Sequence, residues 1–361
     1  QRQMCIRDSY DGWVPRNYSY TYSNSEVGLD YALQQSLNTV PVEIMSDMGI
    51  QTSFDFMTQK LGFTTLVEAE EINGEIYTDL GYAQLALGGL THGATNIEMT
   101  AAYCIFPNQG VYNKPYTFTE IKNESGETIL TGRDSDTTWE AIKPETAAIM
   151  NRYLNSVVTS GTGRGAALSD GTFTAGKTGT TEAYNDLWFV GYTPYYTCAV
   201  WSGYDNNEKL PDYARNFHKA LWKKVMTRIH EGLPSKEFEK PASVEKLSVC
   251  EETGLLPRAG CPVITEYFDV GTMPTEYCDQ HFYDSDDYDY NYDTDSSDQT
   301  DNTTDTDNSE SSDNGDTDNS GDSNNTDDNG NSGDDGTDNT GGSDDNGDGN
   351  EGDSSYQVDY Y

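Results

Sequence analysis

The segment Ala175–Thr181 (A-G-K-T-G-T-T) combines one lysine with small and hydroxyl side chains, a set of groups that can hold an anionic substrate. Glycine lets a substrate backbone come close, and hydroxyls and backbone amides can bind a carboxylate. Lys177 would add positive charge without a metal ion. A chance match at an ordinary strand end would look the same, so this segment alone does not assign a function.

A second short motif, Ser36-Leu37-Asn38, lies earlier in the chain. A serine can pass on a proton and an asparagine can hydrogen-bond an amide. The same triplet is equally compatible with a polar helix end or cap. The pattern S-x-N also occurs at Ser312-Asp313-Asn314, so only its order relative to Lys177 gives it weight.

The cysteines are a third candidate for chemistry. Cys104 and Cys198 have apolar neighbours in sequence, as free buried cysteines often do. The last three cysteines and His281 give C-x10-C-x16-C-x2-H, which is too irregular to predict a zinc site. We therefore expect a disulfide or plain thiols there, with metal as the alternative, and we assign no cofactor and no metal. The six cysteines are Cys5, Cys104, Cys198, Cys250, Cys261 and Cys278.

Helical periodicity dominates the elements that must position the first two motifs. Glu26–Met48 carries apolar residues at steps of three and four, and we expect Pro41 to interrupt this helix, which would expose Ser36–Asn38. Tyr10–Tyr22 before it is typical of an extended or turn segment. Further short helices are predicted at Thr52–Leu61, Tyr82–Leu87 and Asn96–Phe106, and a longer one at Pro144–Val158.

Strand patterns follow in the second half. Lys114–Leu130 alternates around a Ser125-Gly126 turn, which predicts a hairpin. Three β-rich segments then predict consecutive antiparallel strands, with Lys177 just past the end of the first. Helices, then strands, then a helix indicate an α+β fold, an antiparallel sheet flanked by helices plus a helical subdomain. The strands are Asp170–Ala175, Asp186–Tyr192 and Tyr195–Tyr204, and the apolar stripe of the last helix is Ala214, Phe217, Leu221, Val225 and Ile229.

Charge is distributed unevenly. From Asp284 to Tyr361 there is no lysine or arginine, and 26 of the 62 acidic residues lie there. This composition cannot bury enough apolar surface to fold, so it predicts a disordered tail, either a solvated spacer or an acidic ligand for a basic partner. The net charge is −41, and −15 remains without the tail, so we expect no nucleic-acid partner and no attraction to anionic membranes.

The chain begins with QRQMCIRD, which fits neither a cap nor a repeat and which we interpret as an assembly or cloning scar. No run of about 18 apolar residues occurs, so no transmembrane helix is predicted in the printed sequence. We therefore divide the chain into a probable artefact at 1–8, a main folded domain at 9–240, a cysteine-containing extension at 241–282 and the acidic tail at 283–361.

Several blocks, in order, resemble class A penicillin-binding proteins over roughly Trp13–His281. The S-x-N and K-T-G triplets have the order of that family's motifs. Several blocks in sequence are far more specific than one triplet. The resembling blocks are Ala32–Pro41, Leu85–Gly89, Glu98–Tyr103, Gly176–Thr181, Asp186–Tyr192 and Glu276–Cys278 with His281.

The resemblance implies a penicillin-binding protein transpeptidase (serine β-lactamase-like) fold for residues 9–240, truncated at its N-terminal side. It implies acyl transfer on peptidoglycan stem peptides ending in D-Ala-D-Ala, with β-lactams trapping the acyl-enzyme. By position, Ser36 would relay a proton, Asn38 would hydrogen-bond the substrate amide, and Lys177 would position Ser36. The substrate-binding residues would be Thr178, Gly179, Thr180 and Thr181, with the threonines at 178 and 180 on the carboxylate and the Thr180 N–H in the oxyanion hole.

One element of the family's motif set is missing. Its S-x-x-K serine, the nucleophile, precedes S-x-N, and no S-x-x-K occurs before Ser36. The match at Ser243–Lys246 has the wrong order, so we interpret it as chance. We expect the nucleophile upstream of Gln1 and the printed chain to be inactive. The family's glycosyltransferase domain and membrane anchor would also lie upstream.

The partners that the resemblance implies are stem peptides, β-lactam antibiotics and other cell-wall synthesis proteins. The expected location is the extracellular face of the bacterial plasma membrane, with membrane attachment only through the N-terminal anchor. A monofunctional transpeptidase, a D,D-carboxypeptidase or a β-lactamase-like hydrolase would share K-T-G. From a different class, a non-catalytic cell-surface binding protein could retain the fold.

Overall fold

The computed structural model describes residues 2–4, 9–10, 12–132 and 137–281, all within one compact unit. The predicted acidic tail at 283–361 and Cys5 lie outside the described residues. Of the segment interpreted as a scar, Arg2–Met4 forms strand β1, paired antiparallel with β2 (Glu26–Gly28). In the described part of the chain, no helix combines the length and the apolar character needed to cross a bilayer.

The described helices follow the predicted order. Gly88 has φ +87 and ends α4, as its glycine predicts. Thr95 begins α5 with a capping box, in which its hydroxyl accepts from Glu98 N and the Glu98 carboxylate accepts from Thr95 N. The helices are α1 (Leu29–Gln35), α2 (Thr39–Met48), α3 (Ile50–Asp55) with the π-helical turn η1 (Phe56–Lys60), α4 (Tyr82–Leu87), α5 (Asn96–Tyr103), α6 (Pro144–Thr159) and α7 (Phe217–Ile229).

The helical subdomain has its own apolar core. Phe54, Phe63, Leu66 and Ala102 are buried together, with Leu85 packed against them. Two short hairpins lie outside this core. The observed hairpin of β6 and β7 begins later than the predicted Lys114 start. The hairpin strands are β3 (Glu70–Ile72) with β4 (Glu75–Tyr77), and β6 (Glu120–Lys122) with β7 (Thr128–Thr131); β5 (Val111–Asn113) pairs with β8 (Thr138–Glu140).

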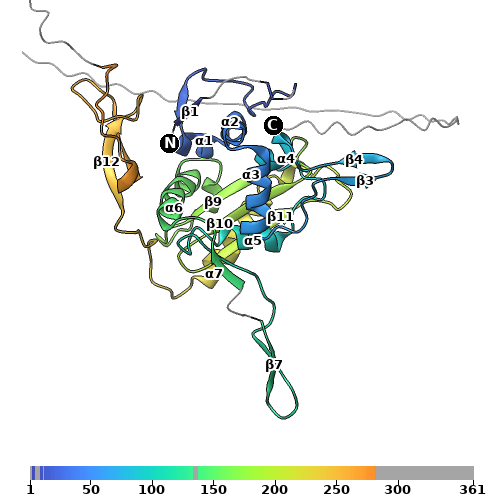
Figure 1. Cartoon of the computed structure of the whole chain (residues 1–361). Coiled ribbons are helices and arrows are strands. Elements are labelled where there is room, and N and C mark those ends of the chain that lie inside the picture. Colours follow the sequence, from blue (N-terminus) through green and yellow to red (C-terminus); the bar gives the residue numbers. More distant parts are fainter. Residues whose placement is uncertain (1, 5–8, 11, 133–136, 282–361) are drawn as a thin grey trace, which may run out of the picture. The chain divides into compact units, whose positions relative to one another are not determined.

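A three-stranded antiparallel sheet in the order β11-β10-β9 forms the centre of the domain, and Figure 1 shows its strands side by side near α5, α6 and α7. Helices on both sides bury it. Phe189 and Val200 pack against Trp222 of α7, while Tyr192 on the opposite face packs with Leu154 of α6. The predicted flanked antiparallel sheet is confirmed. Its strands are β9 (Ala175–Thr180), β10 (Leu187–Tyr192) and β11 (Thr197–Ser202).

Helix α7 buries a different face from the predicted one. Phe217, Leu221, Val225 and Ile229 are between 36% and 55% exposed. The buried line is His218, Trp222 and Met226. These two apolar lines lie about 100° apart on the helix, so periodicity alone cannot choose between them. The choice is made by the sheet, because Gly191 leaves room for the Trp222 ring: an added Cβ there would lie 2.9 Å from it.

The end of the described chain is a separate antiparallel hairpin of β12 (Val244–Cys250) and β13 (Val263–Asp269). Its strands neighbour α6. The chain then forms a parallel bridge between Leu256 and Tyr277, which brings residues 276–281 back to the turn after β12.

Candidate active site

Ser36 lies at the break between α1 and α2. Its N–H donates to Leu33 O and the N–H of Leu37 donates to Ala32 O, the pattern of a Schellman helix end. Ser36 has φ 54 and ψ 48, the left-handed conformation usually taken by glycine. The predicted helix break is confirmed, but it does not expose the triplet, because Asn38 is buried and Ser36 and Leu37 are half-buried. The cause of the break is not Pro41 either. Pro41 lies in the first turn of α2. Backbone N–H groups there have no acceptor within the helix, so a proline costs no helical hydrogen bond.

Lys177 lies inside strand β9, whereas the sequence predicted a strand that ended at Ala175. Thr172 N donates to the Asp170 carboxylate, a local turn that keeps the preceding residues out of the sheet. Gly176 permits the strand to continue, since a Cβ there would lie 2.7 Å from Val190 O. The K-T-G segment is therefore an edge strand paired with β10, and its other edge has no partner strand among the described residues.

The structure brings the two motifs into direct contact. Lys177 Nζ donates to Ser36 Oγ at 2.6 Å and to Thr178 O at 3.0 Å. Burial lowers the pKa of Lys177 to about 8, because the ammonium is removed from water. With Nζ donating to its oxygen, the Ser36 hydroxyl keeps its own proton to donate into the site. A lysine amine with this pKa can give up or take a proton at a pH close to neutral.

Asn38, two residues after Ser36, is held in place by a residue that sequence reasoning missed. Its Nδ2 donates to Arg16 O at 2.7 Å, and its backbone N–H donates to Asn17 Oδ1 at 2.9 Å. Asn17, only 1% exposed, also accepts from Thr39 N and so caps α2 from outside the helix. Asn17 belongs to the predicted turn segment, but no local signal links it to a helix that starts 22 residues later.

The predicted substrate-binding residues follow one another along β9 and its end. Thr178 Oγ1 hydrogen-bonds Thr162 Oγ1 at 2.8 Å, while Thr180 is exposed. Thr181 is used locally, since its hydroxyl accepts from Asp186 N at 2.8 Å and closes the β9–β10 turn. Gly179 lies opposite Trp188.

Thr162 is a second residue that sequence reasoning missed. Its N–H donates to Gln34 O at 3.1 Å, so the loop after α6 joins the end of α1 to β9. Gly161 allows this approach, because a Cβ there would lie 2.6 Å from Gln34 O. The run Gly161-Thr162-Gly163 was a usable signal, since glycines around a hydroxyl residue often mark close backbone approach.

The S-x-x-K match at Ser243–Lys246 does not contribute to this site. Ser243 Oγ donates to Glu145 Oε1 at 2.5 Å, and Lys246 Nζ lies 5.2 Å from the ring centre of Tyr267. The serine and the lysine of the match therefore have separate partners, consistent with a chance match.

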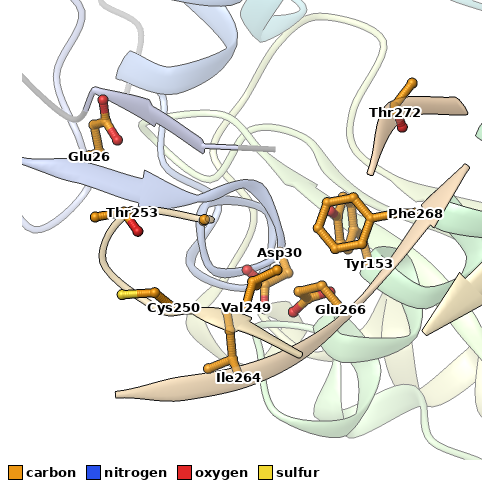
Figure 2. Close-up of a pocket in the computed structure, with 12 residues that line it drawn as sticks. Glu26, Asp30, Tyr153, Val249, Cys250, Thr253, Ile264, Glu266, Phe268 and Thr272 are labelled. Carbon is orange, nitrogen blue, oxygen red and sulfur yellow. The ribbon is translucent and has the colours of Figure 1, made fainter. Parts of the chain in front are cut away.

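A pocket of about 410 Å³ lies elsewhere, between β2, α1, α6 and the β12–β13 hairpin, as Figure 2 shows. Glu26, Asp30 and Glu266 give it an acidic lining. Burial and the charge of Asp30 raise the pKa of Glu266. None of the residues predicted for the active site lines this pocket, and an acidic wall would not attract the carboxylate of a stem peptide.

Groups that could hold a metal ion gather at the C-terminal hairpin and not at Ser36. Cys250, Cys261, Cys278 and His281 bring their ligand atoms within 4.8 Å of one another. The four residues whose sequence spacing we judged too irregular for zinc therefore lie close together in the structure. The described cysteines are free thiols, which is one of the two forms that the sequence predicted here.

Comparison with known proteins identifies the family of the folded domain. Residues 7–227 match the family model of the penicillin-binding protein transpeptidase domain, and residues 240–283 match that of the penicillin-binding protein 1A C-terminal domain. Penicillin-binding protein 1A of Clostridium tetani is 32% identical over 276 residues, which cover 74% of this chain and 34% of the relative. The protein of that name from Aquifex aeolicus is also 32% identical, over 274 residues covering 74% and 34%.

Solved structures share the fold at lower identity. Penicillin-binding protein 1A from Haemophilus influenzae superposes with a TM-score of 0.59 at 21% identity, covering 77% of this chain and 45% of that one. The penicillin-binding protein PonA1 from Mycobacterium tuberculosis gives 0.57 at 22% identity, covering 67% and 66%. The chain spans about a third of the length of the curated relatives it matches. It belongs to the penicillin-binding protein transpeptidase family.

Proposed function

We propose that this chain carries the S-x-N and K-T-G half of a D,D-transpeptidase site, which transfers acyl groups on stem peptides ending in D-Ala-D-Ala. The observation that carries the proposal is the 2.6 Å hydrogen bond between Lys177 Nζ and Ser36 Oγ at an open strand edge. An acyl transfer of this kind needs a proton relay beside the leaving amine. Ser36 supplies that relay, and Lys177 positions its hydroxyl.

Strand register supports a substrate lying along β9. Thr181 N donates to Asp186 O at 3.1 Å, so these two residues form a hydrogen-bonded pair. Hydrogen-bonded and non-hydrogen-bonded pairs alternate along antiparallel strands, so the next pair, Thr180 and Leu187, is not hydrogen-bonded. The N–H of Thr180 therefore points away from β10, towards the open edge. There it can donate to the oxyanion of a tetrahedral intermediate while the substrate backbone adds as a further strand.

The hydroxyls of Thr178 and Thr180 share one face of this edge, and Lys177 lies on the other. A terminal carboxylate at the edge would accept from both hydroxyls and gain from the lysine's charge. Asn38 has its Nδ2 committed to Arg16 O, which leaves its side-chain oxygen to accept from a substrate N–H.

The reaction also needs a serine nucleophile, and the printed sequence has none before Ser36 in the family's order. We propose that the nucleophile belongs to the reading frame upstream of Gln1. For the whole protein we also propose a glycosyltransferase activity, other cell-wall synthesis proteins as partners, and a location on the outer face of the plasma membrane. These proposals rest on the resemblance to class A members.

The test is intact-mass analysis after incubation with benzylpenicillin, on the printed chain and on a chain extended through the upstream reading frame. We expect one adduct, on the extended chain alone. In that chain Ser36→Ala and Lys177→Met should slow acylation about 10²-fold or more, as loss of a proton relay does. Ser248→Ala, on strand β12, is the matched control and should acylate at the normal rate.

Absence of an adduct on an extended chain with a cooperative unfolding transition would reject the proposal. It would favour the non-catalytic binding protein that retains the fold. Release of D-Ala without cross-linked product would instead identify a D,D-carboxypeptidase.

A further inference from the structure

The turn after strand β12 brings together three cysteines and one histidine that the transpeptidase site does not use. Cys250 is the last residue of β12, and Cys261 lies in the loop that leads to β13. Cys278 returns to the same place because its N–H donates to Leu256 O at 2.8 Å. His281 follows three residues later. Cys250 also lines the acidic pocket, and Figure 2 shows its sulfur directed away from Asp30 and Glu266.

The distances match a tetrahedral ion. Zinc bonds of about 2.3 Å to sulfur and about 2.0 Å to nitrogen place a sulfur and a nitrogen ligand about 3.6 Å apart. His281 Nδ1 lies 3.5 Å from Cys250 Sγ and 3.2 Å from Cys278 Sγ. All four ligand atoms, including Cys261 Sγ, lie within 4.8 Å of one another. Three thiolates and one imidazole are a common ligand set of structural zinc sites.

The surroundings orient the ligands. His281 Nε2 lies 3.0 Å from Glu252 Oε2, so the carboxylate holds the ring proton on Nε2 and leaves the Nδ1 lone pair facing the sulfurs. The backbone N–H of Arg258 donates to Cys261 Sγ at 3.2 Å. A hydrogen bond from the backbone stabilises a sulfur that carries negative charge.

This part of the chain has little apolar core of its own. Among the described residues, none of the five apolar clusters takes a buried member from residues 240–281. The buried apolar residues of the segment are Val244, Val249, Cys250, Phe268 and Cys278, two of which are themselves cluster thiols. Segments of about 40 residues usually need a metal or disulfides to hold a fold.

A disulfide explains the arrangement less completely. It would join two of the three sulfurs and leave the third thiol, the imidazole and the Glu252 contact without a function. We propose that Cys250, Cys261, Cys278 and His281 bind one structural Zn²⁺ ion, which fixes the turn after β12 to residues 276–281. Binding releases the three thiol protons and leaves the imidazole neutral.

The test is zinc content. The full printed chain is expressed with a histidine-free tag, purified without chelator, and analysed by elemental mass spectrometry and native mass. We expect about one zinc ion per chain. Cys261→Ser and His281→Ala should lose it, whereas Cys104→Ser, a matched variant in another part of the chain, should keep it. Glu252→Gln should retain the ion but bind it about tenfold more weakly in a chelator competition.

A second measurement does not depend on any variant folding. Replacement of zinc by Co²⁺ in the wild-type chain should give the intense visible and charge-transfer bands of tetrahedral cobalt thiolate. A wild-type mass lower by two hydrogens with no metal, measured without reductant, would identify a disulfide and overturn the proposal. Rapid titration of the thiols of Cys250, Cys261 and Cys278, with neither zinc nor the cobalt spectrum, would overturn it as well. Neither result bears on penicillin acylation, so this proposal and the transpeptidase proposal can fail separately.

Discussion

The central sheet and the β12–β13 hairpin are both antiparallel, yet they are stabilised in different ways. In β10, Leu187, Phe189 and Tyr192 are at most 1% exposed, because helices cover both faces of the sheet. In β12 the middle residues are exposed or half-buried and only the ends are buried. Burial of large side chains accounts for the first element. The β12–β13 hairpin instead combines backbone hydrogen bonds with the cluster of three cysteines and one histidine, and it has little apolar core. Regular strand pairing alone therefore says little about what stabilises a sheet.

Among the changes that test this difference between the central sheet and the β12–β13 hairpin, Trp222→Ala should lower the free energy of unfolding most. Trp222 is fully buried against Phe189 and donates to Cys198 O at 2.8 Å. Its removal leaves a cavity in the core, so we expect a loss of about 3–5 kcal/mol in the free energy of unfolding. Denaturant titration measures that loss. Hydrogen exchange should show lost protection in β10 and β11 first; equal loss in β12 and β13 would mean that the two regions unfold as one.

Tyr192→Phe tests a polar contact inside the same core. The Tyr192 hydroxyl donates to Asn151 Oδ1 at 2.8 Å, and both residues are buried. Phenylalanine keeps the ring packing but leaves the amide oxygen without its donor, so we expect a loss of about 1–3 kcal/mol. Tyr213→Phe is the matched control, because Tyr213 is 90% exposed. An unchanged unfolding midpoint for Tyr192→Phe would show that water replaces the hydroxyl.

The pH dependence of stability tests the burial of Lys177. Its pKa is about 8 in the folded chain and 10.5 ordinarily. Between these values the unfolded chain binds a proton that the folded chain does not. The free energy of unfolding of the wild type, relative to Lys177→Met, should therefore rise from about pH 8 to about 10.5, by up to about 1.4 kcal/mol per pH unit. Comparison with Lys224→Met, on the exposed side of α7, separates this effect from general lysine titration; a flat difference would refute it.

The smallest effect is expected on the exposed stripe of α7. Leu221 is 36% exposed, so Leu221→Gln should change the free energy of unfolding by no more than about 0.5 kcal/mol. Met226→Gln, one turn further on the buried face, should destabilise the protein strongly because it places an amide in the core. A large loss for Leu221→Gln would mean that this stripe is buried after all.

Sequence patterns were most successful where a local signal decides the structure. Gly88 and Pro144 set helix ends by themselves. Patterns failed where a distant element decides. The α7 face depends on the space above Gly191, and the strand that holds Lys177 continues only because Gly176 fits against Val190.

The candidate site was predicted only in part for the same reason. Ser36 and Lys177 were chosen from their types and order, and the structure joins them. Asn17 and Thr162 act through a few hydrogen bonds to residues far along the chain, and such contacts leave no periodic pattern in the sequence. The sequence left metal binding by the cysteines as the less favoured alternative because of their spacing, whereas the Leu256–Tyr277 bridge brings Cys278 to Cys250.

The left-handed backbone of Ser36 has a consequence for protein engineering. A residue with a Cβ in this conformation is less stable than glycine by about 1 kcal/mol. A library of variants selected for heat resistance alone would therefore enrich glycine at position 36. Glycine at this position removes the hydroxyl that accepts from Lys177 Nζ. The most heat-resistant variants would therefore be those that had lost the proposed proton relay. Selection on this scaffold needs a penicillin-binding readout in every round.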